Sequence, residues 1–227
     1  MPHSTSPTPR LLLALDTGSP VVSVAVGDRG LVLAERSLEL SRSSGALLSL
    51  VDETLKAAGV TLQSLEGLLG LRGPGSFTGL RVGLATLQGL HEALGIPATA
   101  IPTFEALAAL SPGDGAQTLA AVDARRDEWF VQPLRADRPV RPLALPRRIG
   151  LVELVSLAPQ RLIGFGVSRL VAAFDPEAVP ALIEPDGLAG AALHSVEARP
   201  PGWDPRLLAA PLYLRRPAVT PLCKAPG

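Results

Sequence analysis

The sequence predicts an α/β fold built from two lobes that share one plan. An apolar run that ends in aspartate, a turn and a second apolar run occur at Leu11–Val26 and again at Thr118–Leu134. Helical segments alternate with short strands after each occurrence, which is typical of mixed α/β lobes. The chain has 227 residues, of which 47% are hydrophobic and 19% charged, so it can bury a large core.

The first lobe is expected to begin with a three-stranded meander. Three short apolar or alternating runs predict its strands, namely Leu11–Leu15, Val21–Val26 and Leu31–Leu40. Turn residues at Thr17–Pro20 and Asp28–Gly30 separate these runs.

A first amphipathic helix is predicted from Ser43 or Ser44, either of which can cap it, to Ala58, before Gly59. Its predicted apolar stripe consists of Leu47, Leu48, Val51, Leu55 and Ala58. The remaining short segments of the lobe are a helical turn at Thr61–Glu66, strands at Leu68–Leu71 and Ala98–Ile101, and a helix at Pro102–Leu110.

A second helix, Phe77 to Leu94, is the most informative element. Ser76 and Thr78 can cap it, and an anion at its N-terminus would be chemically reasonable. Apolar and small residues cover roughly 220° of its circumference, about twice what a surface helix needs. One flank carries Gly79, Val82, Gly83, Thr86, Gly89, Leu90 and Ala93, and the other carries Leu80, Leu84, Leu87, His91 and Leu94. We expect one flank to face the sheet, and the small flank to permit close helix packing by the first helix or by a partner.

The second lobe is predicted from a repeat of the strand pattern. Its expected elements are strands Thr118–Val122, Glu128–Leu134 and Leu162–Phe165 and helices Leu151–Leu157 and Gly187–Glu197. The predicted domains are a disordered lead-in at 1–10, an N-terminal lobe with interface helices at 11–102, a C-terminal lobe at 103–205 and a tail at 206–227 returning to the N-terminal lobe.

The tetrapeptide Asp16-Thr17-Gly18-Ser19 has two functional interpretations. As a protease motif it would need a second carboxylate that shares a proton with Asp16, and Asp123-Ala124-Arg125 lacks the matching Thr and Gly. As the phosphate hairpin of an actin-like ATPase it would present backbone N–H groups to a nucleotide. The position at the first turn of the meander favours this second interpretation.

The matching hairpin at Asp123 is degenerate, because no glycine follows to adopt a positive φ close to a phosphate. A further segment, Gly164–Ser168 ("GFGVS"), faintly resembles an adenosine loop. We therefore expect a two-lobed actin-like ATPase (ribonuclease H-like) fold with a degenerate second lobe. An active nucleotide enzyme of the sugar-kinase type remains the alternative.

Composition excludes several function classes. Formal net charge is zero, which disfavours a protein that holds nucleic acid by itself. The chain has one cysteine, Cys223, and scattered histidines at His3, His91 and His194, so neither a disulfide framework nor a metal site is predicted. No apolar run is long enough for an ordinary membrane span, and no signal core is present, so a cytoplasmic protein is expected. The pairs Arg147-Arg148 and Arg215-Arg216 are interpreted as solvated charge.

Several segments resemble the bacterial tRNA threonylcarbamoyladenosine biosynthesis family TsaB, also called YeaZ. They are "LLALDTGSPVVSVAV", "LRGPGSFTGLRVGLATLQGL", "IPTFEALA", "AAVDARRDEWFV" and "PLYLRRPAV". The resemblance is most specific at Arg72–Gly83 and is good from Leu11 to Leu134. The family is a degenerate relative of the catalytic subunit TsaD, and this chain lacks the metal-binding His-x-x-x-His of TsaD.

The resemblance implies a non-catalytic scaffold, a pseudo-enzyme that pairs with a TsaD-type subunit and a TsaE-type ATPase. That complex transfers threonylcarbamoyl to adenosine 37 of ANN-decoding tRNAs, with ATP or ADP and metal bound by the partner subunits. It also implies an interface, with TsaD or a second copy, on the two N-lobe helices, formed here by Leu47, Leu50, Val51, Thr54, Gly79, Val82, Gly83, Thr86, Gly89 and Leu90. Ser43 stands where many relatives have histidine, which would alter one cap or contact.

Overall fold

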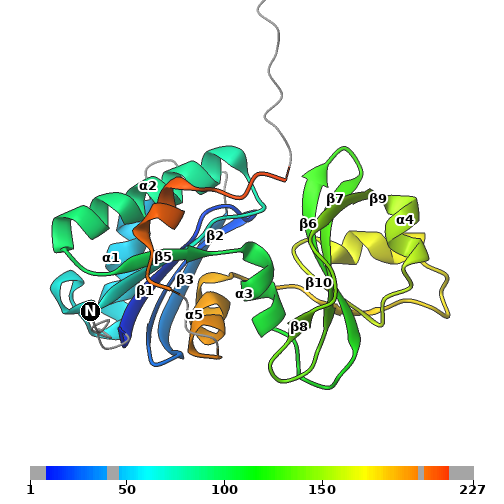
Figure 1. The fold of residues 1–227 in the computed structure, drawn as a ribbon, viewed down its shortest axis with the longest axis horizontal. Coiled ribbons are helices and arrows are strands. Elements are labelled where there is room, and N and C mark those ends of the chain that lie inside the picture. Colours follow the sequence, from blue (N-terminus) through cyan, green and yellow to red (C-terminus); the bar gives the residue numbers. More distant parts are fainter. Residues whose placement is uncertain (1–8, 40–45, 199–201, 215–227) are drawn as a thin grey trace, which may run out of the picture.

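The computed structural model describes residues 9–39, 46–198 and 202–214, which fold around two β-sheets (Figure 1). The N-terminal sheet has the strand order β3-β2-β1-β4-β5. Its strands are β1 (Leu11–Asp16), β2 (Val21–Asp28), β3 (Leu31–Glu39), β4 (Gly67–Leu71) and β5 (Ala98–Ile101). The first three form the predicted antiparallel meander, and β4 and β5 run parallel to β1.

The C-terminal sheet repeats this plan in the order β8-β7-β6-β10-β11, with β9 also paired to β7. Its strands are β6 (Gln117–Arg125), β7 (Glu128–Arg135), β8 (Arg141–Pro142), β9 (Arg147–Gly150), β10 (Arg161–Ile163) and β11 (Ala181–Ile183). Strands β6, β7 and β8 are antiparallel, and β10 and β11 run parallel to β6. The predicted two-lobed fold is confirmed, whereas β8, β9 and β11 were missed because they are too short to show a period.

Helices cover both faces of the N-terminal sheet. The helices are α1 (Leu47–Ala58), α2 (Phe77–Leu94), α3 (Thr103–Ala109), α4 (Leu151–Ser156) and α5 (Ala189–Ala198), and the short 3-10 segments are η2 (Leu62–Ser64), η3 (Val167–Ala173) and η4 (Pro205–Ala209). Helices α1 and α2 share one apolar core with this sheet. Helix α3 lies between the two sheets and α5 lies against the N-terminal sheet, and both belong to a second core (Figure 1). Across the described ranges, none of the helices has the length and apolar character needed to cross a membrane.

Helix α5 corrects the predicted lobe boundary at residue 205. It packs on β1, β2 and β3 of the N-terminal sheet. The Ser23 hydroxyl on β2 accepts hydrogen bonds of 3.0 Å from the backbone N–H groups of Leu188 and Ala189. Glu35 on β3 accepts a third, of 3.1 Å, from the N–H of Gly190. The sequence pattern located the helix, but its partners lie some 165 residues earlier, so the lobe to which it belongs could not be read from chain order.

The described part of the predicted tail, 206–214, lies against the N-terminal lobe. Segment η4 contacts β5 and α2. The Leu212 N–H donates a 2.6 Å hydrogen bond to the carbonyl of Arg72, and the Arg72 guanidinium donates one of 3.0 Å to the carbonyl of Ala210. Residues 215–227, with Arg215, Arg216 and Cys223, lie outside the described residues.

Helix α1 begins later than predicted and faces the core with a different stripe. Its N-cap is Ala46, without a side-chain capping bond, and Ser43 and Ser44 lie outside the described residues. Leu48, predicted to be buried, is 64% exposed. The buried residues are Leu47, Leu50, Val51, Thr54 and Leu55. The polar Thr54 is accommodated because its hydroxyl donates to the Leu50 carbonyl at 2.6 Å.

Helix α2 receives the first hairpin on its glycine face. Its N-cap is Ser76, whose hydroxyl accepts a 3.2 Å hydrogen bond from the Gly79 N–H. The Thr17 hydroxyl donates to the Gly79 carbonyl at 2.8 Å. A Cβ on Gly79 would lie 1.9 Å from the Thr17 carbonyl oxygen, and one on Gly83 would lie 2.0 Å from the Thr17 hydroxyl. The hairpin can reach the helix only because both positions lack a side chain.

The two classes of glycine on α2 should respond oppositely to alanine. Gly79→Ala should lower the free energy of unfolding by about 2 kcal/mol, since the new methyl group overlaps backbone atoms of Thr17. Gly89→Ala should raise it by about 0.5–1 kcal/mol, because no atom lies within 4 Å of the added Cβ and alanine favours the helix. Urea denaturation of both variants measures the difference. Equal effects would mean that the hairpin does not depend on the glycine face.

Candidate functional site

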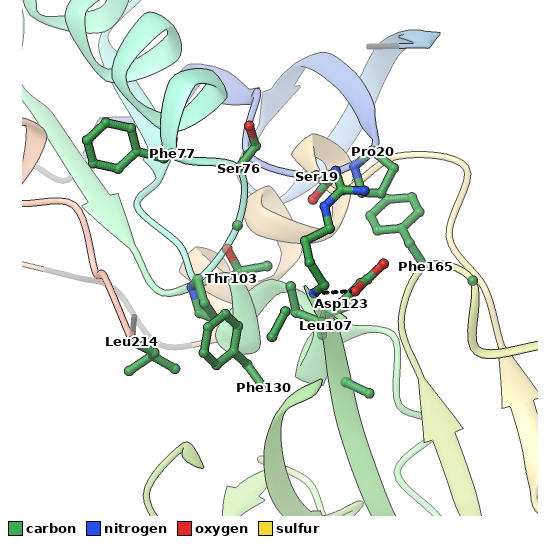
Figure 2. Close-up of a pocket in the computed structure, with 18 of the residues that line it drawn as sticks. Ser19, Pro20, Ser76, Phe77, Thr103, Leu107, Asp123, Phe130, Phe165 and Leu214 are labelled. Atoms are coloured by element: carbon green, nitrogen blue, oxygen red, sulfur yellow. Dashed lines mark hydrogen bonds between the residues drawn. The ribbon is translucent and has the colours of Figure 1, made fainter. Parts of the chain in front are cut away.

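A cavity of about 850 Å³ lies between the two lobes. The cavity is lined by Gly18, Ser19 and Pro20 of the first hairpin and by Asp123 of the second hairpin. Figure 2 shows Ser19 and Asp123 within one cleft, with Phe130 and Phe165 around them. Of the five predicted nucleotide-loop residues, Gly18, Ser19 and Asp123 therefore reach the cleft, whereas Asp16 and Thr17 do not line it.

The backbone donors of the first hairpin are already engaged. Asp16 Oδ1 accepts hydrogen bonds from the N–H groups of Gly18 at 2.9 Å and Ser19 at 3.3 Å. The Ser76 N–H donates to the Gly18 carbonyl at 2.7 Å, which pins the loop before α2 to the hairpin. A phosphate bound to the N–H groups of Gly18 and Ser19 would have to displace their bonds to Asp16.

Asp16 is a buried carboxyl group. Its side chain is fully buried, and Oδ2 has no hydrogen-bond partner among the described residues. Burial raises the pKa of Asp16 to about 6, an effect opposed by hydrogen bonds from Ser19 and Gly18 and increased by the negative charge of Glu35. A carboxyl group in this position is not presented to the cleft as a metal ligand or a protease dyad would be.

The second hairpin has a backbone that was not predicted. Asp123 Oδ1 accepts a 2.6 Å hydrogen bond from the Arg125 N–H, the counterpart of the Asp16–Gly18 bond. Arg125, Arg126 and Asp127 have φ values of 68°, 59° and 60°. The hairpin was expected to be less free to adopt positive φ because it lacks glycine, yet three successive residues adopt it. Arg125 pairs with Glu128, so the loop consists of Arg126 and Asp127, and the turns that best match the twist of two-residue hairpins have positive φ at one or both of these positions.

The C-terminal lobe brings several charges to the cleft. Arg125, Arg126, Arg169 and Asp123 line it, and Arg169 pairs with Asp123 at 3.3 Å. Phe165 and Gly166 of the "GFGVS" segment also line the cleft. A Cβ on Gly164 would lie 2.0 Å from the Ala121 carbonyl, so this glycine lets the loop approach β6. Sequence reasoning named the segment but missed the arginines as cleft residues.

A cluster of aromatic rings and one cation joins the described C-terminal segment to α2. The rings of Phe77 and Tyr213 lie 4.8 Å apart, and the Arg81 guanidinium lies 4.0 Å from the centre of the Phe77 ring. Arg81 also donates to the Tyr213 hydroxyl at 3.2 Å. Phe77 and Tyr213 line the cleft, and their separation by 136 positions hid this contact from sequence reasoning.

Most of the predicted partner interface is buried within the chain. Six of its ten residues are enclosed by their own sheet or hairpin, namely Leu47, Leu50, Val51, Thr54, Gly79 and Gly83. Val82 is 46% exposed, Gly89 is exposed, and Thr86 and Leu90 are half-buried. These six therefore offer little surface to a partner while the chain keeps this fold. Periodicity identified two apolar flanks but could not show that the first hairpin covers part of one.

A continuous uncharged surface remains on α2. We call it the exposed face of α2, and it consists of Thr78, Val82, Ala85, Thr86, Gly89 and Ala93. These positions lie within about 100° of the helix circumference. Their side chains are short, so another helix could approach this face closely.

The remaining polar residues singled out in the sequence lie as follows where the structure describes them. His91 Nδ1 lies 2.7 Å from the Ile96 carbonyl, consistent with a structural histidine. Within the described ranges, no three His, Cys, Asp or Glu side chains gather as metal ligands would. Arg148 pairs with Glu128 at 3.2 Å, and Arg147 pairs with Glu153, both at the surface. His3 lies outside the described residues.

Comparisons with known proteins identify clear relatives. A family model described as "TsaD: tRNA N6-adenosine threonylcarbamoyltransferase" matches residues 40–136. The chain is 37% identical over 127 residues to TsaB of Haemophilus influenzae and 34% identical over 121 residues to TsaB of Escherichia coli. These alignments cover 55% and 52% of the chain, and it spans about half the length of these relatives, 54% and 52%.

Other relatives match over nearly the whole chain. An uncharacterized protein of Mycobacterium tuberculosis is 31% identical over 218 residues, covering 93% of this chain and 94% of the relative. The crystal structure of a Pseudomonas aeruginosa protein with similarity to peptidase YeaZ has a TM-score of 0.72 at 26% identity, covering 91% of this chain and 100% of that one. The structure of YeaZ from Pseudomonas aeruginosa has a TM-score of 0.69 at 26% identity, with 90% and 100% coverage.

The pKa of Asp16 makes a prediction about stability. Between pH 4 and pH 6 the folded state binds more protons at Asp16 than the unfolded state, so this contribution to stability falls as pH rises through that window. The substitution Asp16→Asn removes this pH-dependent contribution to stability, because asparagine does not titrate. The unfolding free energy of the wild type relative to the variant should decrease by up to about 3 kcal/mol from pH 4 to pH 7.

The control for this titration is Asp114→Asn. Arg161 lowers the pKa of Asp114 to about 2, so the wild type should gain stability relative to this variant as pH rises from acid. Urea denaturation across pH measures both. The same pH trend in the two comparisons would rule out the burial effect at Asp16.

Proposed function

The chain belongs to the TsaB/YeaZ family, and from this premise we propose that it takes part in the formation of N6-threonylcarbamoyladenosine in tRNA. In this proposal it is a non-catalytic subunit that pairs with a TsaD-type catalytic subunit. The target is adenosine 37 of ANN-decoding tRNAs. The chain works in the cytoplasm and meets tRNA through the assembled complex.

The state of the first hairpin supports the non-catalytic role. Gly18 N–H and Ser19 N–H are bonded to Asp16, and the Asp16 carboxyl group is buried away from the cleft. A phosphoryl-transfer enzyme needs free donors and a carboxylate that reaches the metal and phosphates. We therefore expect ATP or ADP and the metal to bind the partner subunits.

The exposed face of α2 supports the partner role. It is uncharged, continuous over four turns of helix and made of short side chains, which suits close packing against a helix of another subunit. Leu48 on α1 adds an exposed apolar side chain on the same face of the N-terminal sheet. We propose that this surface binds the TsaD-type subunit, that a second copy of the chain uses it when that subunit is absent, and that a TsaE-type ATPase joins the complex.

Val82→Arg tests the partner surface. The substitution places a long cation in the middle of the exposed face of α2, where a close helix contact would leave it buried and unpaired. Co-purification with the TsaD-type subunit should fall at least about tenfold while thermal unfolding stays unchanged, since Val82 is 46% exposed. Gly83 does not serve for this test because its substitution disturbs the hairpin.

The matched control is Val152→Arg. Val152 lies on α4 of the C-terminal lobe and is 86% exposed, so the same substitution is made at a second, more exposed valine far along the chain. It should leave co-purification at the wild-type level. If Val82→Arg co-purified as fully as the wild type, or if the control lost as much co-purification as Val82→Arg, the exposed face of α2 would not be the partner surface.

One observation favours a second candidate, a nucleotide enzyme of the sugar-kinase type, because both aspartate hairpins border the same cleft. On the proposal above, isothermal titration of the isolated chain with ATP should show no Mg²⁺-dependent binding, and ATP hydrolysis should stay at background. Mg²⁺-dependent binding would favour the enzyme. A peptidase site receives no support, because Asp16 is buried and does not line the cleft.

A further inference from the structure

The cleft between the lobes combines an apolar lining with unpaired cations. Its apolar lining includes Leu188 and the labelled side chains of Phe77, Leu107, Phe130, Phe165 and Leu214 (Figure 2). Its volume, about 850 Å³, lies within the range of sites that enclose small organic molecules. A wholly apolar ligand would suit the lining, but not the charges at its edge.

The charges of the cleft do not cancel. Three arginines and one aspartate line it, and only Arg169 is paired with Asp123. Arg125 and Arg126 are exposed, and their guanidinium groups make no ion pair or hydrogen bond with any residue in the described ranges. The formal charge of the lining is therefore positive in a protein of zero net charge.

The turn that carries these arginines is conformationally unfavourable. Arg125 and Arg126 both have left-handed φ values, which side chains other than those of Asn, Asp and Gly rarely adopt. Arg126 is the first residue of the two-residue loop and Arg125 lies at the irregularity in the pairing just before it, and glycine or asparagine would adopt either conformation with less strain. A strained turn that presents two unpaired cations to a cleft points to a role for those cations in binding.

We infer that the cleft binds a small organic anion, with its apolar or aromatic body on the hydrophobic lining and its negative group on Arg125 and Arg126. The arginines are the available donors because the N–H groups of Gly18 and Ser19 are engaged by Asp16. Guanidinium groups bind carboxylates and phosphate monoesters alike. The proposal does not depend on the function proposed above, and it requires neither Mg²⁺ nor hydrolysis.

Anilinonaphthalene sulfonate is a suitable first probe, since it joins an aromatic body to one anionic group and fluoresces more strongly in an apolar site. The folded full-length chain should bind it saturably, with one site per chain. Hippurate and AMP, added as competitors, then distinguish a carboxylate ligand from a phosphate monoester. Adenosine and inorganic phosphate, which each carry half of the required chemistry, should compete at least about tenfold less well.

Two variants and one control locate the site. The double variant Arg125→Gln/Arg126→Gln should weaken probe binding about tenfold or more, as expected for the loss of charge-assisted hydrogen bonds. Arg126→Gly should weaken binding and also raise the melting temperature, because glycine relieves the left-handed φ. The control Arg147→Gln/Arg148→Gln removes two arginines that are paired with Glu153 and Glu128, and it should bind the probe as the wild type does.

Three results would overturn the proposal. The variant Arg125→Gln/Arg126→Gln could bind the probe as the wild type does, the control could lose as much binding as this variant, or the wild type could show no saturable binding. Competition by inorganic phosphate as strong as that by AMP would also overturn it, since the apolar lining would then contribute nothing. Failure here leaves the partner test at Val82 unaffected, because the exposed face of α2 and the cleft are tested by separate readouts.

Discussion

The contact between Thr17 and the glycine face of α2 determines how the first lobe is arranged. Gly79 and Gly83 let the hairpin backbone approach the helix, and the Thr17 hydroxyl then bonds to the Gly79 carbonyl. Once the hairpin is held there, Asp16 is enclosed and must satisfy itself from its own turn, which engages the Gly18 and Ser19 N–H groups. The packing of the hairpin against α2 thus determines which backbone N–H groups of the hairpin remain available to a ligand.

The same helix therefore separates two kinds of surface. Its glycine face is used inside the chain, whereas the exposed face of α2 is uncharged and open to another subunit. The cleft lies at the other side of the hairpin, and its arginines come from the second lobe. The first hairpin, the exposed face of α2 and the cleft can differ in what they do, because different side chains form each of them.

Much of the fold could be predicted because the two lobes repeat the order of strand, aspartate turn and strand. Long elements such as α2 and β1 were predicted to within a residue. The site was predicted less well. Periodicity showed that α2 has a wide apolar arc but not that Thr17 covers part of it, so Gly79 and Gly83 were assigned to a partner. Arg125 and Arg126 were missed because residue type alone argues against positive φ.

The sequence by itself determined the two-lobed α/β plan and the family, because both depend on local patterns of apolar residues, turns and short motifs. Only the tertiary structure decided which small residues of α2 are exposed, which lobe receives α5 and which side chains face the cleft. Those outcomes depend on contacts between residues such as Ser23 and Leu188, or Phe77 and Tyr213, that are far apart along the chain. Local periodicity carries no information about which distant segment will cover a given face.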